Sequence, residues 1–409
     1  MRRGARPLFC KGEDSGRRRA WAALIGLVLA FAAPPTLATP VPSSESATEA
    51  ASRIWLWPDR TAPGSQRVAA RQAIVERSDD PALPDRIVTG VTQPYLVVYR
   101  PSRADGSALL VIPGGGYERV VLDKEGTALV PAFVERGGVT LFVLRYRLPG
   151  DGHENTRDAP LADAQRALRL VRTRAGEWNL DPARIGVLGF SAGGHVAASL
   201  GTRFDERVYA PVDAHDEASA RPDFMALIYP VIDMGEGVRC AATGRGAPGR
   251  PSTDVRTGLP GSDDRHAKAQ HEVCAPVFHP GSRERLLGAA PLPEHVTAYS
   301  LQTRIRAGTP PTFLLHAADD DAVPVENSLV FHRALRRAGI PAELHVYPHG
   351  GHGFGVRGTA GTSLALWPQM AIAWMRETGG ARAAEAAKAP DRSDIGQTSV
   401  VAPAKAGAQ

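Results

Sequence analysis

The sequence predicts an α/β fold with a mostly parallel central sheet and helices on both faces. Short runs rich in β-branched and aromatic residues alternate with longer segments of helical periodicity over residues 53–378, as expected for strand–helix–strand units. The chain has 409 residues, of which 43% are hydrophobic and 22% charged. Such a composition is typical of globular proteins, and the length allows a large core. We therefore expect one α/β domain over residues 53–378.

Six short apolar runs bounded by turn residues are predicted to be the strands. They are Ala108–Ile112, Val139–Tyr146, Ile185–Phe190, Phe224–Tyr229, Thr312–His316 and Glu343–Tyr347. Over residues 161–178 apolar residues recur at spacings of three and four, which predicts a helix with one buried face. Further helices are expected over Val325–Ala338, which Gly339 ends, and over Trp367–Glu377.

The two ends of the chain are predicted to lie outside this domain. Residues 1–38 combine a basic segment, the apolar run 21–33 and a small-x-Ala site, which is the pattern of a secretory signal peptide. An uncleaved membrane anchor is the alternative. Residues 39–52 are expected to be a linker and residues 379–409 a disordered tail, because neither carries a periodic apolar pattern. The protein is accordingly expected to be secreted or periplasmic.

Residues 235–278 interrupt the alternation of strands and helices. They are rich in Gly, Pro, Arg and Asp, and so long a segment without periodicity is usually an insertion or a functional loop. The segment holds Cys240 and Cys274, the two cysteines that remain once residues 1–38 are removed. In an oxidising compartment the two could pair as a disulfide, which we prefer, or stay as free thiols.

The motif with the clearest chemical meaning is Gly-x-Ser-x-Gly over residues 189–193, centred on Ser191. It follows the apolar strand Ile185–Phe190 and opens a helical segment of small residues. In that setting the motif predicts a nucleophile elbow, a sharp strand-to-helix turn that projects the serine Oγ above the sheet. The start of the helix would direct backbone N–H groups at a reacting carbonyl. The alternative is a tight turn with an idle serine.

A triple glycine at residues 114–116 directly follows the strand Ala108–Ile112. Glycines let the main chain turn its N–H groups into a site, and a nucleophile elbow needs such a loop to bind the oxyanion. We predict Gly115 and Gly116 as oxyanion-hole donors, with the N–H of Ala192 as the third. A plain flexible loop is the alternative.

The acid of a serine triad should come after the serine and before the histidine. Asp319, Asp320 and Asp321 stand together after the strand Thr312–His316. We prefer Asp320, and interpret Asp319 and Asp321 as solvated charges or turn formers. The alternative is that all three acids only solvate the loop.

His352 is the predicted base, because it lies in a glycine-rich loop after the last strand, from which an imidazole can reach Ser191. His345 and His349 lie nearby, so a metal site formed with the acids is the alternative. A strand and a loop do not give the facing geometry of a helical metal motif, and we predict no metal and no cofactor. His195, next to the elbow, is expected to pack on its helix.

Together these motifs resemble secreted bacterial α/β-hydrolases of the acetyl esterase and acetylxylan esterase type, with hormone-sensitive-lipase-like and feruloyl-esterase-like relatives. The resemblance covers about residues 53–378 apart from 235–278, and its most specific segments are GFSAGGH, PGGGY, LDKEG, TPPTFLLHAADDDAVPVENS and PAELHVYPHGGHGFG. It implies the α/β-hydrolase fold and the same site: Ser191, Asp320 and His352, with Gly115, Gly116 and Ala192 as oxyanion donors. Unlike the lipase-type relatives, which have His before the triple glycine, this chain has Pro113.

We therefore expect a serine carboxylic-ester hydrolase that forms an acyl-enzyme on Ser191. The resemblance implies small esters or acetylated oligosaccharides and polysaccharides such as xylan as substrates, and leaves the oligomeric state open. A serine exopeptidase of the same fold is one rival, but such relatives carry a large domain before the hydrolase. A non-catalytic binding protein on a hydrolase scaffold is the other, but such proteins lose residues of the triad that this chain retains.

The net charge of +5 does not indicate a nucleic-acid or membrane partner. Residues 1–38 hold seven basic side chains against two acidic ones, so the whole excess belongs to the predicted signal peptide. The rest of the chain is neutral overall, and therefore lacks the net attraction that nucleic acids or anionic membranes exert on basic proteins. A neutral chain suits an uncharged ester substrate.

Overall fold

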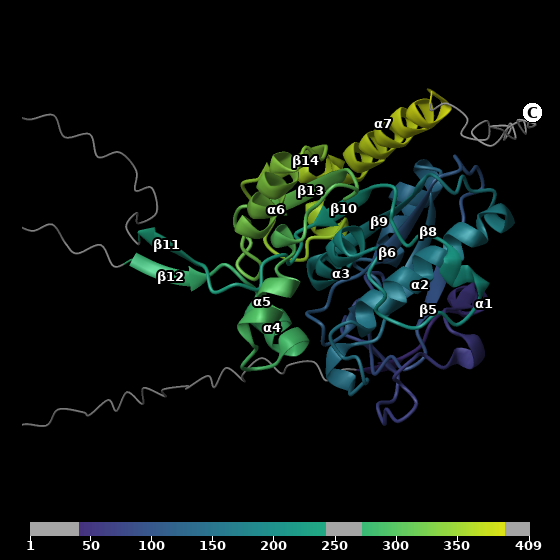
Figure 1. The fold of residues 1–409 in the computed structure, drawn as a ribbon, viewed down its shortest axis with the longest axis horizontal. Helices are drawn as coiled ribbons and strands as arrows, with labels where there is room; N and C mark the ends of the chain where they lie inside the picture. The colour runs from purple at the N-terminus through teal and green to yellow at the C-terminus, as the bar shows by residue number, and fades with distance from the viewer. Residues whose placement is uncertain (1–40, 243–271, 389–409) are drawn as a thin grey trace, which may run out of the picture. The chain divides into compact units, whose positions relative to one another are not determined.

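The computed structural model describes residues 41–242 and 272–388, which are built around one eight-stranded sheet (Figure 1). Six of its strands run parallel, and two at one edge continue it in antiparallel pairing. In spatial order the strands are β14 (Ala342–Tyr347), β13 (Thr312–Ala317), β10 (Met225–Ile228), β9 (Ile185–Phe190), β6 (Ala108–Ile112), β8 (Thr140–Arg145), β5 (Tyr95–Tyr99) and β2 (Arg53–Trp55). The six predicted strands are therefore confirmed, with ends that move by at most one residue.

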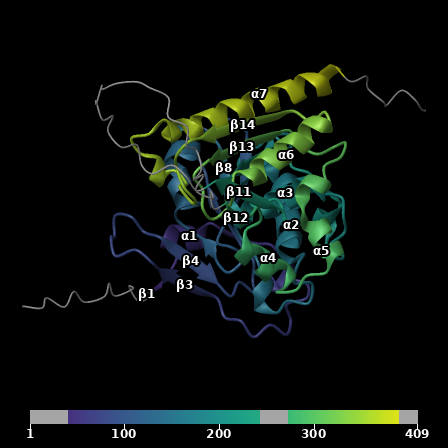
Figure 2. The same cartoon turned by 90° about the vertical axis from the view of Figure 1, so that its left-hand side faces the viewer.

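Helices cover both faces of the sheet, as predicted (Figure 2). Side chains of α2 (Ala159–Thr173), α3 (Ser191–Thr202) and α6 (Glu326–Arg337) belong to the hydrophobic core of one face. Side chains of a π-helical segment, Val130–Arg136, and of α7 (Trp367–Lys388) form the core of the other. The inner strands are buried along their whole length, because a parallel sheet with helices on both faces has no solvent-facing side.

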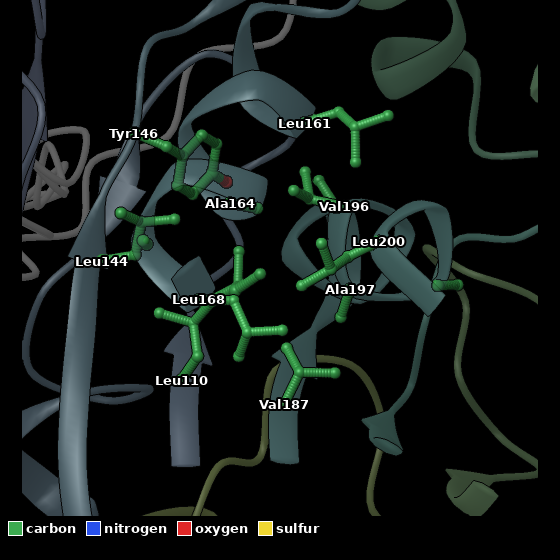
Figure 3. Close-up of a cluster of buried hydrophobic side chains, with 14 of the residues drawn as sticks. Leu110, Leu144, Tyr146, Leu161, Ala164, Leu168, Val187, Val196, Ala197 and Leu200 are labelled. Carbon is green, nitrogen blue, oxygen red and sulfur yellow. The ribbon is translucent and has the colours of Figure 1, made fainter. Parts of the chain in front are cut away.

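The core layer that holds α3 in place is shown in Figure 3. Leucine and valine side chains from three neighbouring strands point at the apolar faces of α2 and α3. The labelled residues are Leu110, Leu144, Tyr146 and Val187 from the sheet side, Leu161, Ala164 and Leu168 from α2, and Val196, Ala197 and Leu200 from α3. Each is at most 3% exposed, and burial of one leucine side chain contributes about 2 kcal/mol. The layer therefore holds the start of α3 firmly against the carboxyl end of β9.

Residues 41–52, predicted to be a linker, instead form β1 (Val41–Ser43) and α1 (Ala47–Ala51). β1 pairs with β3 (Ala73–Glu76) in a small antiparallel sheet that continues through β4 (Arg86–Thr89) and β7 (Val120–Val121). A capping box starts α1: Ser46 Oγ accepts from the Glu49 N–H, and Glu49 accepts from the Ser46 N–H. The sequence did not predict these elements because polar contacts hold them in place, and their residues show no periodic apolar pattern.

Charged side chains hold this N-terminal segment to the rest of the domain. The Arg86 guanidinium donates hydrogen bonds to both carboxylate oxygens of Glu49, at 2.9 and 3.1 Å, and to Asp123 at 2.7 and 2.9 Å. The side chains of Glu49 and Arg86 are only 4% and 13% exposed. Burial opposes the charge of Glu49, but the hydrogen bonds from Arg86 and Ser46 outweigh it and lower the pKa of Glu49 to about 2.

The chain ends and the 235–278 segment also differ in part from the predictions. α7 continues to Lys388, so residues 379–388 are helical and not part of a tail. Within 235–278, β11 (Val238–Ala242) and β12 (Glu272–Pro276) pair as antiparallel strands, and α4 (Pro280–Leu287) and α5 (Pro293–Tyr299) follow. Residues 243–271, the predicted signal peptide 1–38 and residues 389–409 lie outside the described residues. Among the described residues, no helix combines the length and apolar character that a membrane crossing requires.

Replacing Glu49 should test how much the N-terminal segment stabilises the domain. Glu49→Ala leaves the mostly buried Arg86 without one of its two carboxylate partners, so we expect the free energy of unfolding to fall by about 3 kcal/mol. Because the pKa of Glu49 is lowered from 4.5 to about 2, its contribution is present above pH 4.5 and is lost as the pH falls towards 2. Denaturant titrations at pH 7 and pH 3 measure both effects. Equal stability of variant and parent at pH 7 would contradict this account.

The register of β11 and β12 places the backbone of Cys240 directly opposite that of Cys274. This arrangement supports the predicted disulfide, which stays a prediction. The chain lacking residues 1–38, unfolded without a reductant, should therefore show no free thiol by thiol titration, and a Cys240→Ser variant should show one. Two free thiols in the parent protein would refute the bridge.

Candidate active site

The turn from β9 into α3 has the geometry of the predicted nucleophile elbow. Ser191 sits at the turn with φ of +51°, a left-handed conformation that is costly for a residue with a side chain. The neighbouring glycines are required by packing: a Cβ on Gly193 would lie 2.2 Å from the carbonyl oxygen of Ile112, and one on Gly189 2.5 Å from Cβ of Ala197. Strand and helix can therefore approach closely only with glycine on both sides of the serine.

Ser191, His352 and Asp320 meet at the carboxyl ends of β9, β13 and β14. Ser191 Oγ lies 2.9 Å from His352 Nε2, and His352 Nδ1 lies 2.7 Å from Asp320 Oδ2. The ionised carboxylate can only accept, so Nδ1–H donates to it and Nε2 is left to accept the serine proton. The structure thus joins the three residues predicted for the triad into one continuous series of hydrogen bonds.

Asp320 is held as an anion by its surroundings. Its side chain is fully buried, and its Oδ1 accepts from the N–H groups of Ala322 and Val323 at 3.0 and 2.8 Å. Burial opposes the charge, but hydrogen bonds from His316 and His352 and from the Val323 N–H outweigh it and hold the pKa of Asp320 well below its ordinary value. A buried, ionised carboxylate is suited to orient an imidazole and to stabilise its protonated form.

The neighbouring acids lie outside this hydrogen-bonded series. Asp319 is exposed, and it accepts from the Gly351 N–H at 2.8 Å and lies 3.3 Å from His349. It therefore fixes the loop that carries His352 and does not contact the serine. Asp321 is exposed as well. The preference for Asp320 among the three acids agrees with this geometry.

The triple glycine lies beside the serine. Gly115 and Gly116 line the same pocket as Ser191 and His352, and no described residue accepts a hydrogen bond from their N–H groups. Ala192 is the second residue of α3, so its N–H has no acceptor within the helix. These three N–H groups are therefore available to a ligand. The N–H of Gly114, by contrast, donates to Glu125 Oε2 at 2.6 Å.

Glu125 and Tyr229, to which the sequence motifs give no role, connect the two loops of the site. Glu125 is buried and accepts from the Gly114 N–H and, at 2.9 Å, from the Tyr229 hydroxyl. The same hydroxyl accepts from the Gly355 N–H at 3.2 Å, in the loop that carries His352. The segment LDKEG contains Glu125, but its partner Tyr229 lies 104 residues away in the sequence. Burial raises the pKa of the Glu125 carboxyl.

A pocket of about 360 Å³ opens in front of Ser191. His279, which caps α4, lines it together with the triple-glycine loop. Its Nδ1 accepts from the Ser282 N–H at 3.0 Å, so the neutral ring carries its proton on Nε2. Burial and the nearby His352 and Arg285 lower the pKa of His279. The pocket is therefore polar and presents a neutral imidazole as a hydrogen-bond donor.

The other histidines take part in local contacts. His195 is buried on α3, where Nδ1 lies 2.7 Å from the Tyr117 hydroxyl and Nε2 lies 2.8 Å from the Tyr299 carbonyl oxygen. Burial lowers its pKa to about 4, so it is neutral at pH 7. His345 pairs with Glu343. In the part of the chain that the structure describes, no three Cys, His, Asp or Glu side chains are grouped as metal ligands would be.

Comparisons with known proteins agree with the geometry. A family model described as the alpha/beta hydrolase fold matches residues 109–356. The chain is 34% identical over 248 residues to endo-1,4-beta-xylanase B of Butyrivibrio fibrisolvens, covering 61% of this chain and 32% of that one. It is 31% identical over 265 residues to an acetylxylan esterase of Xylanibacter ruminicola, covering 64% and 43%. It therefore spans less than half the length of either relative.

A solved structure is similar over nearly its whole length. The acetyl ester-xyloside bifunctional hydrolase from Caldicellulosiruptor lactoaceticus shares 33% sequence identity with this chain, at a TM-score of 0.58. The similarity covers 83% of this chain and 98% of that one. The expectation of the fold and family from sequence motifs is thus confirmed.

The link through Glu125 can be tested by substitution. Glu125→Ala leaves the Gly114 N–H and the Tyr229 hydroxyl without their acceptor, so we expect the triple-glycine loop to shift. A shift of about 1 Å at such donors costs roughly 100-fold in kcat, with little change in KM. Glu125→Gln keeps one acceptor oxygen and should recover part of the loss. Steady-state kinetics and thermal melts, with the exposed Glu177→Ala as control, separate this effect from unfolding. Full activity in Glu125→Ala would contradict the role.

Proposed function

Because the chain belongs to the α/β-hydrolase family, whose model matches residues 109–356, we propose that it is a serine carboxylic-ester hydrolase. One observation carries the proposal: Ser191, His352 and Asp320 form a continuous series of hydrogen bonds at the mouth of a pocket lined by the triple glycine. Acyl transfer requires a serine with an adjacent base, an acid that is ionised and orients the base, and free N–H groups, and all of these are present here.

The proposed reaction has two halves. Ser191 Oγ attacks the ester carbonyl while His352 Nε2 takes its proton, and the N–H groups of Gly115, Gly116 and Ala192 stabilise the oxyanion. The imidazolium then protonates the leaving alcohol, and the acyl group stays on Ser191. In the second half His352 activates a water molecule, which releases the acid and restores the serine. Asp320 stabilises the imidazolium in both halves.

The substrate that we propose is an acetyl ester of xylan or of related oligosaccharides. Two of the similar proteins are named for the hydrolysis of acetyl esters, an acetylxylan esterase and an acetyl ester-xyloside hydrolase. The pocket supports a small acyl group, because its volume of about 360 Å³ is at the low end for ligand sites and its lining is mainly polar. A long acyl chain would need an apolar channel.

We also propose that the enzyme acts outside the cytoplasm. The basic segment and the apolar run of residues 1–38 support export. Outside the cytoplasm the enzyme would have access to polymeric xylan. The two cysteines of β11 and β12 would also be in an oxidising environment there.

Release of acetate tests both the reaction and the acyl group. Acetylated xylan and p-nitrophenyl acetate should be hydrolysed faster than p-nitrophenyl esters of long acyl chains. Ser191→Ala should lose at least about 10⁴-fold in kcat on all of them while it keeps its fold by circular dichroism. Ser199→Ala, on the same helix, is the matched control. Parent-like turnover in Ser191→Ala would overturn the mechanism, and activity confined to long acyl chains would overturn the acetyl assignment.

A further inference from the structure

The pocket in front of Ser191 carries an excess of positive charge. Among the described residues its lining holds four cationic side chains and two acidic ones: Arg77, Arg119, Lys124 and Arg285, and Glu118 and Glu125. Glu125 is buried behind the triple glycine, where its oxygens accept from Gly114 and Tyr229. The charged groups that a ligand would meet at the pocket wall are therefore mostly cations.

Two carboxylates are shared among these four cations. Glu118 Oε2 lies 2.7 Å from the guanidinium of Arg285 and 3.2 Å from that of Arg119. Asp85 Oδ2 lies 2.8 Å from Arg77 and 3.5 Å from Lys124. Each pair of cations thus has one carboxylate, which leaves about one positive charge uncompensated in each group. The zero net charge of residues 39–409 does not reveal this local excess.

The hydrogen bonds of Arg119 are not all satisfied within the part of the protein that the structure describes. Its Nε is buried, yet it has no hydrogen-bond partner among the described residues. The side chains of Arg119 and Arg285 are nonetheless 35% and 38% exposed, so a ligand in the pocket can reach them. A guanidinium presents its N–H groups as a planar fork that fits the two oxygens of a carboxylate. A carboxylate in the pocket would pair with the exposed parts of these two side chains.

We propose that the enzyme prefers acetyl esters of acidic sugars, in which a uronic-acid carboxylate lies close to the acetylated hydroxyl. This inference rests on the proposed function. An acetyl group carries no charge of its own, so the carboxylate that the pocket recognises belongs to the sugar. Arg119 and Arg285 bind this carboxylate, and Arg77 and Lys124 add to the positive potential of the pocket. The uncharged ring of His279 donates a hydrogen bond beside them. This proposal departs from the uncharged ester substrate that the neutral charge of residues 39–409 suggests.

A matched pair of substrates tests the preference. Methyl 3-O-acetyl-glucuronoside and methyl 3-O-acetyl-glucoside differ only in the carboxylate at C6. We expect kcat/KM to be at least about fivefold higher for the acidic sugar at low salt, and the ratio to fall as the salt concentration rises. A ratio of one at all salt concentrations would overturn the proposal. A preference for p-nitrophenyl hemisuccinate over p-nitrophenyl butyrate, without one for the acidic sugar, would place the carboxylate on the acyl side and overturn it too.

Variants that remove a positive charge and a variant that removes a negative charge together distinguish a loss of carboxylate binding from a loosened structure. Arg119→Gln and Arg285→Gln should each lower the acidic-to-neutral ratio about fivefold, whereas Glu118→Gln, which removes the carboxylate between them, should raise it. The control is Arg174→Gln, which removes an ion pair with Glu177 outside the pocket lining and should leave the ratio unchanged. A fall of the ratio in Glu118→Gln as well would show a structural effect and refute the proposal.

The two proposals fail in different ways. If neither acetylated sugar releases acetate while the acetates of other alcohols are hydrolysed, the sugar assignment of the proposed function fails, and this inference with it. If both sugars release acetate at equal rates, the proposed function stands and only the preference for acidic sugars fails.

Discussion

The turn between β9 and α3 is the constraint on which the rest of the site depends. Ser191 has a left-handed backbone, and no Cβ fits at Gly189 or Gly193. So strained a turn persists only where the surrounding structure enforces it, and here the enforcement comes from α2, α3 and three buried strands (Figure 3). The packing of the core thereby fixes the position of Ser191 Oγ. The loops after β6, β13 and β14 lie around this atom.

Buried polar groups hold those loops in addition to apolar contacts. Glu125 and Tyr229 join the triple-glycine loop to the loop of His352, and Asp320 receives backbone N–H groups from the loop after β13. Asp123, two residues before Glu125, binds Arg86 and so connects to Glu49 of the N-terminal segment. Paired charges are costly to bury and costly to break. The N-terminal segment therefore supports the loop that would bind the oxyanion.

The sequence predicted the fold and the proposed triad because both have strong local signals. Apolar runs mark the strands, and the elbow, the triple glycine and His352 lie next to strand ends. The parts that it missed depend on contacts between distant residues. The linker prediction failed because Glu49 is held by Arg86, 37 residues away, and Glu125 could not be assigned before its partners Gly114 and Tyr229 were known. The positive charge of the pocket could not be predicted because the charges of residues 39–409 sum to zero.

The central claim is that Ser191 is a nucleophile activated by His352 and Asp320. Labelling with a fluorophosphonate tests it most directly, because this reagent reacts only with an activated serine. Intact-mass measurement should show one adduct per chain, and peptide mapping should place it on Ser191, with labelling slowed strongly in His352→Ala. No adduct, or an adduct on another residue at the same rate in both proteins, would contradict the account.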